Sequence, residues 1–170
     1  MVDTPVATAQ PAAPAAPAAQ PAPTFLDDPK ALAGIAYLAG GIGGYGFGDG
    51  GYWGLLGLII PLAIYFHNKG KKNDPFLAFC SFQAFLWTLV VVGIGFVFYF
   101  LFVASLRTAY YDPIGYYAGG GLGASLGLIG LFGMVGFVIM LIDLFLAFKA
   151  YSGEKVKLPV IGGMAEHPFL

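Results

Sequence analysis

Two polar side chains, Gln83 and Asp143, lie inside long apolar stretches of this sequence. A charge at the centre of a bilayer costs about 2.5–3.5 kcal/mol on insertion scales, so an acid there usually faces a partner or water. Three interpretations of Asp143 stay open: an acid near the cytoplasmic headgroups, because Lys149 follows closely, a helix-packing contact with a partner, or part of a proton or ion pathway. For Gln83 we expect a hydrogen bond between helices.

The remaining reactive residues form no catalytic or metal-binding pattern. A metal site needs several His, Cys or carboxylate ligands at set spacing, whereas His67 and His167 stand singly at segment ends and Cys80 lies alone in an apolar run. Either His as a haem or chlorophyll ligand, and the many Phe side chains as a pigment or quinone surface, are alternatives to ordinary interfacial and packing roles. We predict no catalytic residue, no metal and no cofactor, and hence not an enzyme.

Glycines at four-residue spacing mark two helix faces where backbones could approach closely. The first face lies in the Gly-rich stretch Ala31–Phe47, and the second lies at the start of the last apolar run. The predicted helix-packing residues, with the two polar side chains above, are Gly40, Gly44, Gly48, Gly119, Gly123, Gly127, Gln83 and Asp143.

The composition shows what kind of elements carry these residues. The chain is 58% hydrophobic and 10% charged, with a mean hydropathy of +0.79, whereas soluble domains are about 25% charged. We therefore expect an all-α integral membrane protein, a bundle of three to four transmembrane helices. The expected spans are about 52–67, 76–106 and 121–149, with 31–48 either a further span or a helix in the interface.

The formal charge of −1 gives no support to a nucleic-acid partner, which requires a basic face. The expected partners are membrane lipids and a larger membrane protein complex. Residues 1–24 are rich in Pro and Ala, which blocks a continuous helix, so we expect a disordered or extended arm that precedes a transmembrane domain at 25–170.

Three Asp-Pro pairs predict helix starts, at Asp28-Pro29, Asp74-Pro75 and Asp112-Pro113. Asp accepts a hydrogen bond from a free N–H at the helix N-terminus, and Pro fits the first helical position.

Charge predicts the orientation. The loop Lys69–Lys72 carries three Lys and the tail after Phe148 carries three more, whereas the Tyr-rich loop at 107–121 carries only Arg107. By the positive-inside rule the Lys69–Lys72 loop and the C-terminus are cytoplasmic. The side of the N-terminus depends on whether 31–48 spans.

The C-terminal string from Lys149 to Gly162, KAYSGEKVKLPVIG, resembles the end of a widespread bacterial family of small membrane proteins of unknown function. That family is itself similar to the channel-type subunit of the chloroplast inner-envelope import machinery. Asn73–Ala84 matches it less specifically, and the family usually has His where this chain has Cys80. The resemblance implies three or four helices in a prokaryotic cytoplasmic (inner) membrane, with both motifs on the cytoplasmic side.

The C-terminal motif also fits an interfacial end of a helix. Lys149 can extend its ammonium to the headgroups, Gly153 is suited to a helix C-cap, and Pro159 prevents the helix from resuming. The predicted cytoplasmic interface motif comprises Lys149, Tyr151, Gly153, Glu154, Lys157 and Pro159.

Two functions remain. The first is a non-catalytic accessory or scaffolding subunit of a larger membrane complex, for example a photosynthetic or respiratory one. The alternative is a channel-like or protein-translocation component, which would need a polar lumen.

Overall fold

The computed structural model describes residues 25–46, 53–71, 73–118 and 120–166 of the 170-residue chain. A 3-10 turn, η1 (Phe25–Asp27), precedes the helices, and all regular structure among the described residues is helical. The helices are α1 (Pro29–Gly46), α2 (Trp53–Lys71), α3 (Pro75–Tyr111), α4 (Pro113–Ala118), α5 (Gly121–Tyr151) and α6 (Ile161–Glu166). The predicted arm at 1–24 lies outside the described residues.

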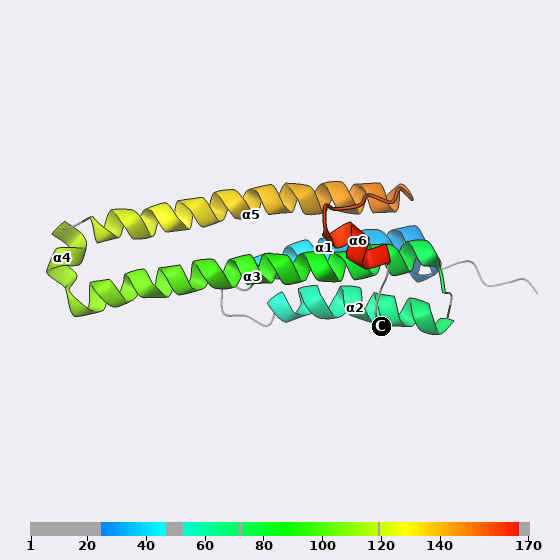
Figure 1. Cartoon of the computed structure of the whole chain (residues 1–170), viewed down its shortest axis with the longest axis horizontal. Helices are drawn as coiled ribbons and strands as arrows, with labels where there is room; N and C mark the ends of the chain where they lie inside the picture. Colours follow the sequence, from blue (N-terminus) through cyan, green and yellow to red (C-terminus); the bar gives the residue numbers. More distant parts are fainter. Residues whose placement is uncertain (1–24, 47–52, 72, 119, 167–170) are drawn as a thin grey trace, which may run out of the picture.

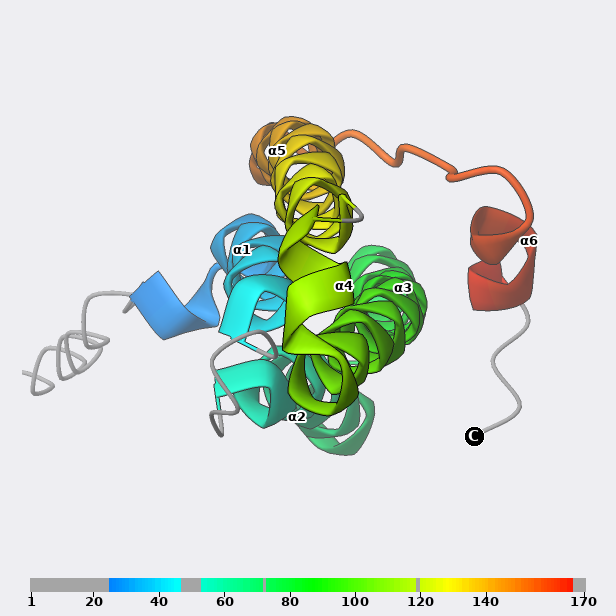
Figure 2. The same cartoon turned by 90° about the vertical axis from the view of Figure 1, so that its left-hand side faces the viewer.

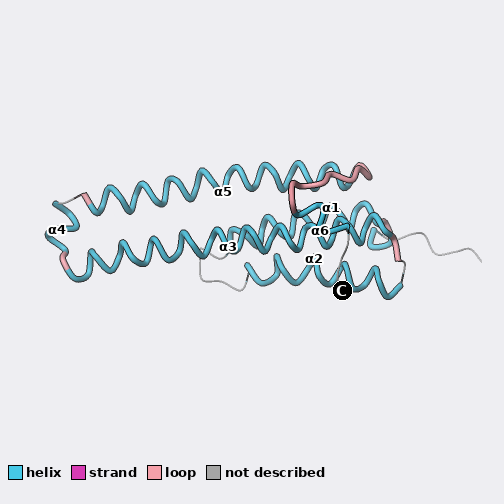
Figure 3. Tube along the Cα trace, in the orientation of Figure 1, coloured by secondary structure: helices cyan, strands magenta, loops and turns pink. Residues whose placement is uncertain are grey.

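Helices α3 and α5 form a long antiparallel hairpin that turns through α4 (Figure 1). Helices α1 and α2 lie along the half of this hairpin that holds the start of α3 and the end of α5, as the trace in Figure 3 also shows. Helix α1 contacts α2, α3 and α5. Seen from the α4 end (Figure 2), α6 lies on the outer side of α3, which it contacts.

The three predicted Asp-Pro helix starts are confirmed, since α1, α3 and α4 each begin at the Pro. Asp74 Oδ1 accepts hydrogen bonds from the backbone N–H groups of Phe76 (2.8 Å) and Leu77 (3.1 Å). Asp28 and Asp112 accept equivalent bonds from Lys30 and Gly115. The local pairing of an acceptor with Pro therefore sets where these helices begin.

In the described part of the chain, two helices are long and apolar enough to cross a membrane, Pro75–Arg107 within α3 and Gly121–Tyr151. The segments predicted at 31–48 and 52–67 are helical, as α1 and α2, but the described residues do not establish them as spans. The described residues thus give two candidate spans, and the predicted number of three to four is not confirmed. The helix α3 itself continues a turn past Arg107, to Tyr111.

The buried core lies where α1 and α2 flank the hairpin. Its centre includes Tyr37, Tyr65, Leu77, Phe82 and Leu146. At the α4 half, by contrast, the hairpin exposes large apolar side chains along both long helices. An exposed apolar surface on spanning helices is the surface that meets lipid or other membrane proteins.

Candidate functional site

Asp143 lies at a junction of three helices in the buried core. Its side chain is 2% exposed, and Oδ1 accepts a 2.7 Å hydrogen bond from Nε1 of Trp87 on α3. On the α1 side, a Cβ added to Gly41 would lie 2.9 Å from Asp143 Oδ2. Only a glycine lets the α1 backbone come this close to the carboxylate. Asp143 is therefore a contact between helices of this chain.

Gln83 forms a second polar layer, one helical turn before Trp87 on α3. Its side chain is fully buried, and Nε2 donates to the Tyr37 hydroxyl of α1 (3.0 Å) and to the backbone carbonyl of Val156 (2.9 Å). The expected hydrogen bond between helices is present. The bond to Val156 shows in addition that the C-terminal segment is tied to the buried core.

Two buried oxygens accept no hydrogen bond from the described residues, Gln83 Oε1 and Asp143 Oδ2. Each carries lone pairs inside an apolar bundle, where an unpaired polar group costs about 1–3 kcal/mol. The two layers thus hold the buried side-chain oxygens that the described residues leave without a hydrogen-bond donor.

Helix α1 enters this junction because its facing residues are small. Ala33 and Ala36 have no exposed surface, and a Cβ on Gly34 would stand 3.4 Å from the Ala147 carbonyl oxygen. A Cβ on Gly40 would overlap the Thr88 hydroxyl. Gly40 therefore makes the close helix contact that its spacing predicts.

The end of α5 is closed by a glycine motif. Gly153 has φ +84° and its N–H donates to the Ala150 carbonyl (2.9 Å), while the Glu154 N–H donates to the Lys149 carbonyl (2.9 Å). These two bonds define a Schellman motif. The expected C-cap at Gly153 is confirmed.

Beyond this cap the chain folds back along α3. Lys155 Nζ lies 5.8 Å from the centroid of the Phe79 ring, and α6 packs on the same helix. Two ion pairs accompany the turn, Lys149–Glu154 at 2.8 Å and Lys157–Glu166 at 2.5 Å. The two remaining motif residues are exposed, Tyr151 and Pro159.

A comparison with protein-family models identifies the family of the chain. The model of the magnetosome magnetite crystal formation protein family, MamF/MmsF, matches residues 28–165, which is most of the chain. The chain belongs to this family. No curated protein and no solved structure matches it.

The MamF/MmsF assignment confirms the coarser part of the resemblance, a family of small bacterial membrane proteins. It replaces the expectation of unknown function with involvement in magnetite crystal formation in the magnetosome. The comparisons give no support to a likeness with the chloroplast import subunit.

In this MamF/MmsF protein the two described glycines of the second face, Gly123 and Gly127, have no close neighbour among the described residues. A Cβ on Gly123 or Gly127 would meet no atom within 4 Å among the described residues. Gly44 lies in α1, and Gly48 and Gly119 lie outside the described residues.

The other candidate residues lie apart from the junction or inside the core. His67 is exposed near the end of α2, Cys80 is 1% exposed within α3, and His167 is not among the described residues. Within the described part of the chain, no group of three or more His, Cys, Asp or Glu could hold a metal ion.

The partners of the two polar residues, Tyr37, Trp87 and Gly41, were not predicted from the sequence. One signal was available, because residues four apart on a helix share a face. Trp87 follows Gln83 by four, and Gly41 follows Tyr37 by four. Which helices these faces meet required the fold.

Proposed function

We propose that this protein is a non-catalytic scaffold that takes part in magnetite crystal formation by holding other magnetosome membrane proteins in one complex. The observation that carries the proposal is the apolar surface of the α3–α4–α5 hairpin. In the most apolar windows of α3 and α5, 11% and 28% of the residues are buried. Phe100 and Phe148 are 65% and 67% exposed.

The open glycines of α5 support a role in binding other helices. Lipid and apolar side chains are equally apolar, so helices associate in membranes through close packing, which small residues permit. Gly123 and Gly127 leave open space on α5. Family membership points to a magnetosome assembly as host, in place of the photosynthetic or respiratory complex considered from the sequence.

The proposed orientation follows from the ends of the hairpin. Lys155 and Lys157 lie beyond the end of α5, and Lys69 lies near the start of α3, whereas exposed Tyr110 and Tyr111 lie next to α4. The positive-inside rule then gives a cytoplasmic α2–α3 connection and C-terminus. The α4 end lies on the opposite face of the membrane.

Affinity purification tests the proposal. A C-terminally tagged copy is purified in mild detergent from magnetosome membranes, and the co-purified proteins are quantified by mass spectrometry. We expect a stoichiometric set of membrane proteins, and fewer of them with Gly123→Leu/Gly127→Leu. The matched control is Gly93→Leu, where an added Cβ also meets no described atom within 4 Å.

A cellular readout addresses the link to the mineral. A strain lacking the gene should form magnetite crystals of altered size or number in electron micrographs, and the wild-type copy should restore them. Recovery of the chain alone as a defined oligomer, together with unchanged crystals in the deletion strain, would overturn the proposal. Deleting residues 1–24 from the tagged copy tests whether the arm contributes to binding the co-purified proteins.

The alternative is a channel-like or translocation component, and one observation favours it. Gln83 Oε1 and Asp143 Oδ2 are buried oxygens that accept no hydrogen bond from the described residues, as groups lining a narrow polar path would be. Ion conductance across liposomes that contain the purified protein, abolished by Asp143→Leu, would favour this alternative.

A further inference from the structure

Helix α1 fills the groove between α3 and α5 over only part of the hairpin. Gly34, Gly40 and Gly41 are its points of close approach, to α5, α3 and α5 respectively. Above Gly41, towards α4, the groove continues as an apolar cleft lined by Val91 and Ile139. A cleft between α3 and α5 therefore begins at the point where Gly41 of α1 makes its close approach.

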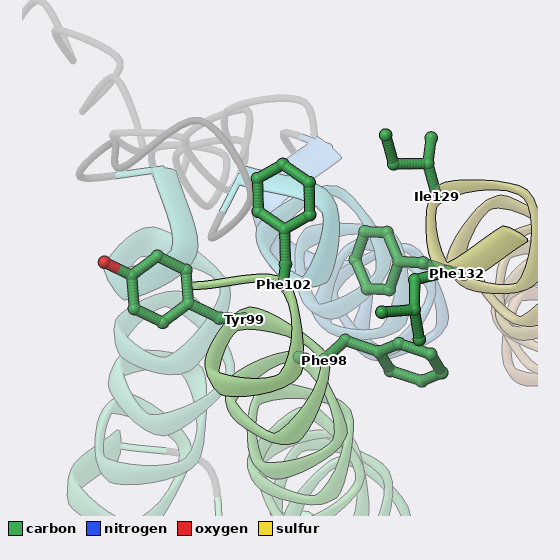
Figure 4. Close-up of a pocket in the computed structure, with 7 residues that line it drawn as sticks. Phe98, Tyr99, Phe102, Ile129 and Phe132 are labelled. Atoms are coloured by element: carbon green, nitrogen blue, oxygen red, sulfur yellow. The ribbon is translucent and has the colours of Figure 1, made fainter. Parts of the chain in front are cut away.

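That cleft leads into a larger apolar pocket of about 210 Å³, with Gly95 and Phe132 common to the linings of both. Figure 4 shows Phe98 and Phe102 of α3 and Ile129 and Phe132 of α5 around it. The Phe98 and Phe132 rings are in contact, with centroids 5.2 Å apart. Gly95 contributes no side chain, and a Cβ built there meets nothing within 4 Å.

The α4 end of the same groove is closed by polar contacts. Ser105 Oγ of α3 lies 3.0 Å from Ser125 Oγ of α5, and the Tyr116 hydroxyl lies 2.5 Å from the same Ser125 oxygen. The pocket is thus an opening in the seam between α3 and α5, bounded by this cluster on one side and by the α1 junction on the other.

We propose that an acyl chain of a membrane phospholipid occupies this pocket. The first reason is continuity, because the pocket opens from the apolar cleft beside Gly41 and shares Gly95 and Phe132 with it. The second reason is the lipid environment of the pocket. Both of its walls belong to helices that are long and apolar enough to span a membrane, and lipid hydrocarbon fills the space around such helices.

The third reason is charge. Arg107 is exposed and is the one cation in the sequence between Lys72 and Lys149. It follows Phe102 by five residues, a rise of about 7.5 Å along α3 towards the α4 end and a turn of about 140° around the helix, so it marks the level of the headgroups and is not part of the pocket wall. A guanidinium at that position, near the end of a span, suits a lipid phosphate, to which Arg donates charge-assisted hydrogen bonds. A phospholipid supplies both the anionic head and the apolar chain.

A bound acyl chain would act as a continuation of α1. It would hold α3 and α5 together in the half of the hairpin that α1 does not reach. This role concerns the fold of the single chain and is independent of which proteins the scaffold binds.

Photocrosslinking tests the site with a matched pair of variants. The full chain is reconstituted in vesicles that contain phosphatidylethanolamine with a diazirine midway along one acyl chain, irradiated, and mapped by mass spectrometry. We expect crosslinks concentrated at 98–102 and 128–132. Gly95→Leu should reduce them by roughly tenfold, equivalent to about 1.4 kcal/mol, because its side chain fills the pocket.

The control is Gly93→Leu on the same helix. A Cβ at Gly93 likewise meets nothing within 4 Å, but Gly93 is not part of the lining, so crosslinking should stay at the wild-type level. Ile129→Trp fills the pocket from the α5 wall and should repeat the loss. Circular dichroism shows that each variant retains its helices.

Three results would overturn the proposal. The first is crosslinking spread evenly over the exposed residues of α3 and α5. The second is wild-type crosslinking in folded Gly95→Leu and Ile129→Trp. The third is a stoichiometric quinone or protein, in place of phospholipid, released from the purified wild-type chain.

Discussion

The indole Nε1 of Trp87 donates a 2.7 Å hydrogen bond to Oδ1 of Asp143, joining α3 to α5 at the level where Gly41 of α1 touches the same carboxylate. Three helices distant in sequence thus meet around one acid. The contacts at this junction and at the C-terminal turn give testable consequences.

Replacing Trp87 by Phe should destabilise the fold more than replacing Asp143 by Asn. Trp87→Phe leaves Asp143 Oδ1 without its donor, which costs about 1–3 kcal/mol, whereas the Asn carbonyl can still accept the indole N–H. The free energy of unfolding in mixed SDS micelles, followed by circular dichroism, measures both. In an Asp143→Leu background, Trp87→Phe should lower the free energy of unfolding by less, because no buried carboxylate then loses its hydrogen-bond donor. Equal costs in the two backgrounds would contradict this account.

Adding one methyl group to Gly41 should lower the free energy of unfolding. The Cβ of Gly41→Ala would lie 2.9 Å from Asp143 Oδ2 and 3.1 Å from its Cβ, so α1 must shift away, at about 1–3 kcal/mol. Gly123→Ala is the control, because its Cβ meets nothing within 4 Å and Ala has the higher helix propensity. The same unfolding measurement should show no loss for Gly123→Ala, and a neutral Gly41→Ala would refute the close approach.

Gln83→Leu should release the C-terminal segment. The substitution removes the donor to the Val156 carbonyl and to the Tyr37 hydroxyl while keeping an apolar side chain of similar size. Hydrogen exchange at residues 155–166 should become faster, whereas exchange within α5 should change little. Unaltered exchange in the tail would mean that the Lys155 and α6 contacts hold it without Gln83.

The cap of α5 should depend on its glycine and hardly on its ion pair. Gly153→Ala places a Cβ on a residue at φ +84°, which costs about 1–2 kcal/mol and should speed proteolysis between α5 and α6. Glu154→Gln breaks the Lys149 pair, whose side chains are 31% and 58% exposed, and should change stability by about 1 kcal/mol or less. A larger loss of stability for Glu154→Gln than for Gly153→Ala would contradict the interpretation that the Schellman motif, and not the ion pair, fixes the end of α5.

Local signals in the sequence were sufficient for much of this fold. An Asp-Pro pair specifies a helix start through atoms within three residues, and all three starts are observed. Gly153 specifies a helix end in the same way, through its own φ angle. Long uncharged runs specify the two candidate spanning helices, since length and composition decide whether a helix can cross a bilayer.

Which faces meet could not be predicted in the same way. In a membrane protein the lipid-facing and partner-facing sides of a helix are both apolar, so hydrophobic periodicity does not separate them. Gly40 and Gly123 have the same four-residue spacing, yet the first packs against Thr88 and the second faces open space. The Trp87–Asp143 pair likewise depends on the register of α3 against α5, which neither helix encodes alone.

The unequal lengths of the helices have a consequence for the bilayer. Near the start of α3, four helices lie side by side, α1, α2, α3 and α5, whereas at the α4 end the described hairpin consists of α3 and α5 (Figure 1). Because each helix has a similar diameter, the described bundle has roughly twice the cross-section near the start of α3 as at its α4 end. If α1 and α2 enter the bilayer beside the hairpin, each copy inserted in the same direction displaces more lipid from the leaflet at the start of α3 than from the other.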